Sequence, residues 1–203
     1  MKQLIALTAV ALLAMAGALQ AQKSSPASSR PASGIPASTS PAPGKPASAG
    51  AAAAAPTDPQ IAMIVVTADN VDIDAGKLAA TKASNPKVKE FAELMVRDHT
   101  SLNNQATELA KKINITPEES ATSRKLKSDG ENSMKKLRGM SGAAFDKAYI
   151  DNEVTYHEAV LKAVDTTLIP NAKTAELKSL LESARPIFVS HLNHAKEAQS
   201  SLR

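Results

Sequence analysis

The sequence has no cysteine and no tryptophan, and only 2% of its 203 residues are aromatic. Without cysteine, a disulfide scaffold, an iron–sulfur cluster and a thiolate zinc site are all excluded. A β-sandwich would draw on aromatic and β-branched strand residues, so the shortage of aromatic side chains argues against that class as well. These absences leave a helical domain as the class to test against the sequence pattern.

The excess positive charge of the chain is confined to its first 57 residues. The formal net charge is +4, but four of the 24 basic residues (Lys2, Lys23, Arg30 and Lys45) lie before residue 58, where no acidic residue occurs. Residues 58–203 therefore carry 20 basic and 20 acidic residues and are neutral. Because nucleic-acid binding needs a basic surface on the folded domain, we expect no nucleic-acid partner.

The N-terminus has the pattern of an export signal. Lys2 precedes an apolar run from Leu4 to Ala16 that is too short to span a bilayer comfortably, and small residues then offer cleavage after Ala18 or Ala21. We interpret residues 1–21 as a signal peptide, with an uncleaved membrane anchor as the alternative. Cleavage would remove the apolar run, so we expect a periplasmic or secreted bacterial protein without an integral membrane segment.

Residues 22–57 contain a five-residue repeat. Residues 26–50 read PASSR PASGI PASTS PAPGK PASAG, so proline opens every repeat. Proline at this spacing prevents a helix, and the small side chains cannot form a core. We therefore expect a disordered, extended Pro/Ala/Ser linker. It is either a spacer that holds the domain away from a protein or envelope partner, or low-complexity sequence without a specific role.

Residues 58–203 have the pattern of a helical domain. Apolar residues recur at steps of three and four, and prolines punctuate the segments. Thr116 is typical of a helix N-cap and Pro117 of the first helical position, so we expect a helix to begin there. That third helix has few large apolar residues and should be peripheral, while the other four form an antiparallel four-helix bundle. The five expected helices span residues 58–83, 86–114, 117–138, 142–169 and 173–201.

On each of three expected helices, one histidine interrupts the seam, which is the line of apolar residues that should face the core of the bundle. His99, His157 and His191 have apolar neighbours at steps of three and four, and Asp72 holds the comparable place in the first helix. With a rise of about 1.5 Å per residue from the hairpin ends, Asp72, His99 and His157 lie at similar depth. His191 lies about one turn deeper, level with Glu153. We expect these side chains to form one polar layer across the bundle.

The residue types of this layer point to a metal site. Imidazole and carboxylate groups are ligands for zinc, copper, nickel and iron. Burying unpaired imidazoles is costly, and a shared cation would offset that cost. We therefore expect a divalent transition metal ion held by His99, His157 and His191, together with Asp72 or Glu153. The alternative is a metal-free network of hydrogen-bonded histidines and carboxylates in a non-enzymatic structural or adaptor domain.

Three further residues accompany the expected ligands. Asp98 lies off the seam and should either orient a ring or form a surface pair. His194, three residues after His191, either joins the site or faces solvent, and solvent is the favoured interpretation. Pro186, inside the last expected helix, should bend that helix either around the polar layer or around the core, and the core is the favoured interpretation.

Three segments of the sequence carry a resemblance to known proteins, namely VKEFAELMVRDHTSLNNQATELAKK (88–112), FDKAYIDNEVTYHEAVL (145–161) and LKSLLESARPIFVSHLNHAKEA (177–198). They resemble one family of exported bacterial proteins, catalogued as domain of unknown function 4142 and related to the ferritin-like fold. The resemblance implies a ferritin-like bundle with one extra helix, and it adds Tyr149 beside the expected ligands. The positions that match the family pattern are Asp98, His99, Tyr149, His157, Pro186 and His191.

The sequence departs from the catalytic ferritin-like proteins in one respect. Those proteins hold two irons with Glu-x-x-His motifs, whereas the nearest pattern here is Glu153-x-x-x-His157. This departure argues against ferroxidase, oxygenase and cage-storage roles. No His-Glu-x-x-His motif or glycine-rich phosphate loop occurs either. We therefore favour a non-enzymatic role, with metal storage, buffering or stress protection as the expected activity.

Overall fold

The computed structural model describes residues 55–202 of the chain, and this part is helical. The expected all-α class is therefore confirmed. The expected signal peptide, and all of the expected linker except residues 55–57, lie outside the described residues. None of the helices between residues 55 and 202 combines the length and the hydropathy that a membrane span requires.

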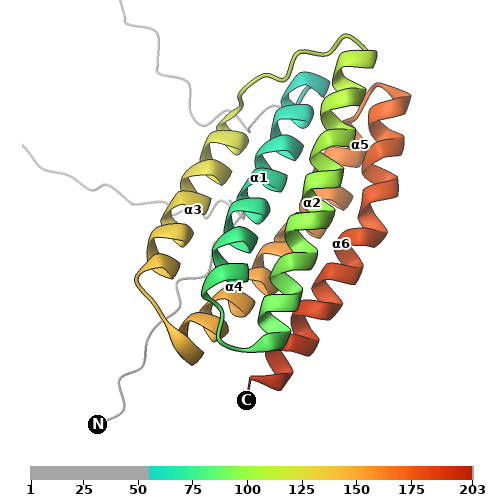
Figure 1. The fold of residues 1–203 in the computed structure, drawn as a ribbon. Helices are drawn as coiled ribbons and strands as arrows, with labels where there is room; N and C mark the ends of the chain where they lie inside the picture. Colours follow the sequence, from blue (N-terminus) through green and yellow to red (C-terminus); the bar gives the residue numbers. More distant parts are fainter. Residues whose placement is uncertain (1–54, 203) are drawn as a thin grey trace, which may run out of the picture. The chain divides into compact units, whose positions relative to one another are not determined.

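Four long helices and one shorter helix make up most of the described chain (Figure 1). The fourth expected helix is real but not uniform, because its α-helical part is followed by a five-residue π-helical turn and then by a short helix. In chain order the elements are α1 (Asp58–Lys82), α2 (Pro86–Lys112), α3 (Ala121–Arg138), α4 (Gly142–Ala163), η1 (Val164–Leu168), α5 (Ile169–Asn171) and α6 (Ala175–Ser201).

Local chemistry fixes where the second and third helices begin. The Asn85 side chain accepts a hydrogen bond from the backbone N–H of Lys87 at 2.9 Å, and Pro86 takes the first helical position as expected. The expected start of the third helix at Pro117 is wrong, because Ser120 caps α3 and exchanges hydrogen bonds of 3.1 and 2.9 Å with Ser123. The preceding residues return to α1 instead, where the Glu118 N–H donates to the Pro59 carbonyl at 3.0 Å.

The four long helices pack around a shared interior, and α3 lies outside them against α1 (Figure 1). The contacts that close this arrangement are α1 with α2, α4 with α6, α2 with α6 and α1 with α4. On α3 only Ser123, Gly130 and Leu137 are buried, so this helix is peripheral as expected. A Cβ at Gly130 would lie 2.7 Å from Val71 Cγ2, which explains why a residue without a side chain stands at the contact with α1.

Two apolar clusters fill the interior, one on each side of the polar residues. On α1, α2 and α6, and on α4 together with η1, the buried polar positions lie between the residues of the first cluster and those of the second. The first comprises Ala75, Ala79, Val88, Phe91, Ala92, Met95, Leu137, Phe145, Tyr149, Ile150, Ala195 and Ala198. The second comprises Ile61, Ile64, Leu102, Val164, Leu168, Leu177, Leu181, Ala184 and Phe188. The buried polar residues between them are Asp69, Asp72, His99, Glu153, His157 and His191.

Candidate metal centre

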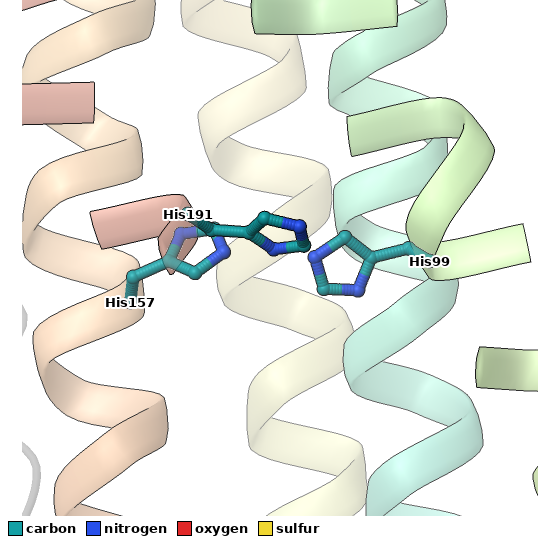
Figure 2. A group of neighbouring side chains, drawn as sticks. All are labelled: His99, His157 and His191. Carbon is teal, nitrogen blue, oxygen red and sulfur yellow. The ribbon is translucent and has the colours of Figure 1, made fainter. Parts of the chain in front are cut away.

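Three imidazoles from three helices meet in this polar layer. Figure 2 shows His99 of α2, His157 of α4 and His191 of α6 pointing toward one another. The ring centroids lie 5.1 Å apart for His99 and His191, 5.4 Å for His157 and His191, and 5.7 Å for His99 and His157. The three residues are 2%, 0% and 1% exposed. One ring nitrogen from each lies within 4.8 Å of the other two, so the three groups could hold a metal ion.

His191 is not one turn deeper than the other rings, as the residue count predicted. A helical side chain leans toward the N-terminus of its own helix. The chain turns between α4 and α6, so α4 ends and α6 begins at the same end of the bundle. The lean therefore moves the rings of His157 and His191 in opposite directions along the bundle, toward a common level. The expected bounds added to the error, because the helical residues continue to Asn171 and α6 begins only at Ala175, so His157 and His191 lie 14 and 16 residues from the turn.

Each imidazole is anchored on its outer side through one ring nitrogen. His99 Nδ1 lies 2.9 Å from Asp69 Oδ1, and His191 Nε2 lies 3.0 Å from Asp98 Oδ2. His157 Nδ1 donates to the backbone carbonyl of Glu153 at 3.0 Å. Because a carbonyl oxygen only accepts, the proton of His157 must be on Nδ1. The lone pair of the neutral ring is then on Nε2.

The second ring nitrogen of each histidine has no hydrogen-bond partner among the described residues. These atoms are His99 Nε2, His157 Nε2 and His191 Nδ1, and all three are buried. A histidine that ligates a metal ion typically donates its outer N–H to a carboxylate or carbonyl and directs its other nitrogen at the ion. All three rings have this arrangement, so the residues present fit a bound metal ion.

Two buried carboxyl groups extend the layer to α1 and along α4. Asp72 Oδ2 lies 3.4 Å from His99 Nε2. Asp72, Glu153 and His157 form a second group whose candidate ligand atoms all lie within 4.8 Å of one another. Both expected carboxylates are therefore beside the imidazoles, and the two groups share His157.

Burial sets the protonation of this layer at neutral pH. It lowers the pKa of His157 to about 3 and that of His191 to about 4, so both rings are neutral and can donate a lone pair. Burial raises the pKa of Glu153 to about 8, although its hydrogen bond with Asp72 acts in the opposite direction. Burial and the neighbouring charges of Glu153 and Asp69 raise the pKa of Asp72 well above its ordinary value. A cation bound here would replace protons on these carboxyls.

Asp98 has both roles that the sequence left open. Its Oδ2 receives the contact from His191, and its Oδ1 accepts a hydrogen bond from Arg97 Nε at 3.0 Å. Partial burial alone would raise the pKa of Asp98, but the bond from His191 and the Arg97 charge lower it. His194 is exposed on α6 and stays outside the centre, which agrees with the favoured interpretation.

Tyr149 lies on the apolar side of the carboxyl pair. Its ring packs against Phe91 and Phe145, with centroid distances of 6.1 and 6.3 Å. Its buried hydroxyl has no hydrogen-bond partner among the described residues. Burial, followed by the charges of Glu153 and Asp72, raises the pKa of Tyr149 well above its ordinary value. The phenol is therefore a neutral neighbour of the centre.

The sequence prediction missed two residues that support the layer. Asp69 anchors His99, and Tyr156 donates its hydroxyl proton to the Ala68 carbonyl at 3.1 Å. One pattern could have found Asp69, because it stands three residues before Asp72 and so lies on the same face of α1. No local pattern marks Tyr156, whose partner lies 88 residues away in the sequence.

Comparison with known proteins places the chain in one family. No curated protein and no solved structure matches it. A family model described as domain of unknown function (DUF4142) matches residues 43–198. That match spans well over half of the 203-residue chain and includes all three converging histidines, and the protein is therefore a member of the DUF4142 family.

Proposed function

We propose that this protein is an exported, ferritin-like four-helix bundle that binds one divalent transition metal ion in its core. His99, His157 and His191 supply three nitrogen ligands, and Asp72 or Glu153 supplies an oxygen ligand. One observation carries the proposal, namely that each of three converging imidazoles is anchored on its outer nitrogen and free on its inner one.

A metal-free network explains the same residues less well. Such a network would pair the buried ring nitrogens with one another or with protein groups, yet none has a hydrogen-bond partner among residues 55–202, and His99 Nε2 has only a long contact of 3.4 Å with Asp72 Oδ2. Leaving a buried polar atom unpaired costs about 1–3 kcal/mol. A cation would satisfy all three nitrogens at once, and the carboxylates of Asp72 and Glu153 would balance its two charges.

The ligand types favour a transition metal over magnesium or calcium. Magnesium and calcium prefer sites built only from oxygen atoms. Imidazole nitrogens suit zinc, copper, nickel and iron, and carboxylates are acceptable ligands for the same ions. The identity of the ion within this group depends on its supply in the compartment where the protein resides.

The surroundings of the centre favour retention of a cation over turnover of a substrate. All five candidate ligands are 2% exposed or less. The Glu-x-x-His motifs of the catalytic ferritin-like proteins are absent from the sequence. We infer a role in metal storage, buffering or stress protection outside the cytoplasm, where the N-terminal export pattern would direct the protein.

Elemental analysis of protein purified without chelator tests this function. We expect about one transition metal ion per chain in the wild type, as in other buried sites of this ligand type. The double variant His99→Ala/His157→Ala should lose the ion, and the exposed-histidine variant His194→Ala should keep it. Circular dichroism would establish that all three proteins are helical. Equal metal content in the wild type and a folded double variant would contradict the proposal and favour the metal-free network.

A further inference from the structure

One side chain connects the buried layer with the protein surface. The side chains of Asp69, Asp72, Glu153 and the three histidines are at most 3% exposed, whereas that of Asp98 is 26% exposed. Asp98 also borders a surface hollow of about 190 Å³ between α2 and α6. The lining residues are Asp98, Ser101, Leu102, Gln105 and Ile187.

The Asp98 carboxylate, which borders the hollow, also contacts one ring of the candidate centre. His191 Nε2 faces outward to Asp98 Oδ2 at 3.0 Å, and His191 Nδ1 is the free nitrogen of the same ring. The centroid of this ring is 5.1 Å from that of His99 and 5.4 Å from that of His157. The His191 ring therefore contacts the Asp98 carboxylate on one side and the other two imidazoles on the other.

The hollow has the size and the polar groups that a hydrated cation needs. Each water of liquid water occupies about 30 Å³, so the hollow can hold an ion with part of its hydration shell. The Asp98 carboxylate is one of its lining groups, and the Gln105 amide N–H donates to Ser101 Oγ, another lining group, at 3.2 Å. The Arg97 guanidinium contacts Asp98 and is the positive group that an arriving cation would displace.

We propose that this hollow is the access route of the metal ion, with Asp98 as the first carboxylate to capture the cation and His191 as the gate to the centre. This inference rests on the proposed function. The captured ion would exchange the Asp98 oxygen for His191 Nδ1 as the ring turns, and it would then reach the remaining ligands. Release would follow the same steps in reverse.

The test depends on a kinetic difference between a residue that lines the access route and a residue that supports the bound ion. A residue that only lines the route changes the rates of metal uptake and release by the same factor, because it does not contact the bound ion. The dissociation constant then stays the same. A residue that supports the bound state changes the dissociation constant and chiefly the release rate. Equal effects on both rates are therefore the distinguishing result.

Ser101→Leu fills the hollow without touching a ligand, and Gln105→Leu is a second variant of the same kind. Both residues are exposed on α2. Uptake of Co²⁺ would be followed by stopped-flow absorbance, and release would be measured by transfer to EDTA. We expect both rates to fall by about tenfold at an unchanged dissociation constant, because a packed side chain must move aside before the ion passes. The control Ser128→Leu, on the exposed side of α3, should behave as the wild type.

The salt dependence of metal association tests whether Asp98 captures the cation. Association of Co²⁺ with the wild type should slow as salt is added, because salt screens the Asp98 carboxylate. In Asp98→Asn this dependence should be clearly weaker. An undiminished salt dependence would remove Asp98 from the capture step.

Two outcomes separate the access route from the proposed function. If Ser101→Leu and Gln105→Leu bind and release Co²⁺ at the wild-type rates, the ion passes elsewhere, and the route is wrong while the metal site stands. If the folded wild type binds no Co²⁺, both the site and its route are wrong.

Discussion

At the scale of single residues, the three imidazoles differ in what holds them. His157 is anchored by a carbonyl of its own helix, so its orientation is set locally. His99 of α2 depends on Asp69 of α1, and His191 of α6 depends on Asp98 of α2. Metal affinity should therefore depend on residues that are not ligands and that stand on neighbouring helices.

Asp69→Asn tests this dependence. The amide can still accept a hydrogen bond from His99 but loses the charge that makes the ring a stronger ligand. We expect Zn²⁺ to bind about tenfold more weakly, as is usual when the partner of a ligating histidine is changed. Competition titration against a chromogenic chelator would measure the affinity. Asp74→Asn, an exposed substitution on the same helix, should bind as the wild type, and equal affinities for the two variants would contradict the prediction.

The ionisable residues of the centre should change the free energy of unfolding of the metal-free protein with pH, and the histidines and carboxyl groups should act in opposite directions. Burial lowers the pKa of His157 to about 3 and that of His191 to about 4, from an ordinary value of 6.5. Below about pH 6.5 the unfolded chain therefore binds protons that the folded rings do not, and the free energy of unfolding falls as the pH falls. Burial raises the pKa of Glu153 from 4.5 to about 8 and raises that of Asp72 well above its ordinary value, so in this interval the folded chain holds extra protons. Stability then falls as the pH rises.

The protein in EDTA should therefore be most stable in weak acid, near about pH 5–6. We expect the free energy of unfolding to drop on the order of 1–3 kcal/mol toward both about pH 4 and about pH 8. Urea denaturation across this range would measure it. Glu153→Gln should reduce the fall on the alkaline side and keep the fall toward acid, and a wild-type stability that rises steadily from about pH 6 to pH 8 would contradict the assignment.

At the scale of helices, the periodicity of the sequence predicts where the helices lie but not the hydrogen bonds that connect them. Every expected helix exists, because caps, prolines and apolar spacing act within a few residues. The turns are closed by distant groups instead. Asp146 of α4 accepts from the backbone N–H groups of Ser84 and Asn85 at 3.0 and 2.8 Å, 62 and 61 residues away. Asp58 accepts in the same way from Lys173 and Thr174, both at 2.8 Å. No local pattern distinguishes these aspartates from exposed ones.

Asp146→Ala measures what such a bond contributes. The residue is 1% exposed, and its loss would leave the two backbone donors and the Ser84 hydroxyl without their acceptor. We expect the free energy of unfolding to fall by about 2–3 kcal/mol. Asp165→Ala removes an exposed partner of Arg185 and should cost about 1 kcal/mol or less. Urea denaturation would compare the two, and equal losses would show that Asp146 does not secure the turn.

At the scale of the whole molecule, the candidate centre could be predicted in its residues but not in its geometry. On α6 the apolar residues spaced by three and four around His191, from Leu177 to Ala198, are the buried face. On α1 the same spacing around Asp72 selects Val65 and Ala68, which are only half-buried, and passes over the buried Asp69. The difference arises because α1 is also packed against the peripheral helix α3, so its buried residues do not follow one stripe. Which ring nitrogen is free depends on contacts between helices and cannot be derived from spacing.

The same geometry predicts that a metal ion should stabilise the whole domain. Because the ligands come from α1, α2, α4 and α6, the unfolded chain cannot hold them together, and the ion binds the folded state alone. At a free Zn²⁺ concentration of about 100 times the dissociation constant, the gain is about 2.7 kcal/mol, which raises the Tm by about 5–10 °C for a domain of this size.

Thermal denaturation followed by circular dichroism would measure this rise. Mg²⁺ at the same concentration should have no effect, because nitrogen ligands suit it poorly. His157→Gln should lose the Zn²⁺ response, since His157 belongs to both candidate ligand groups, whereas His194→Gln, an exposed histidine on α6, should retain it. A rise of equal size in His157→Gln would place the stabilising ion on the surface and not in the core.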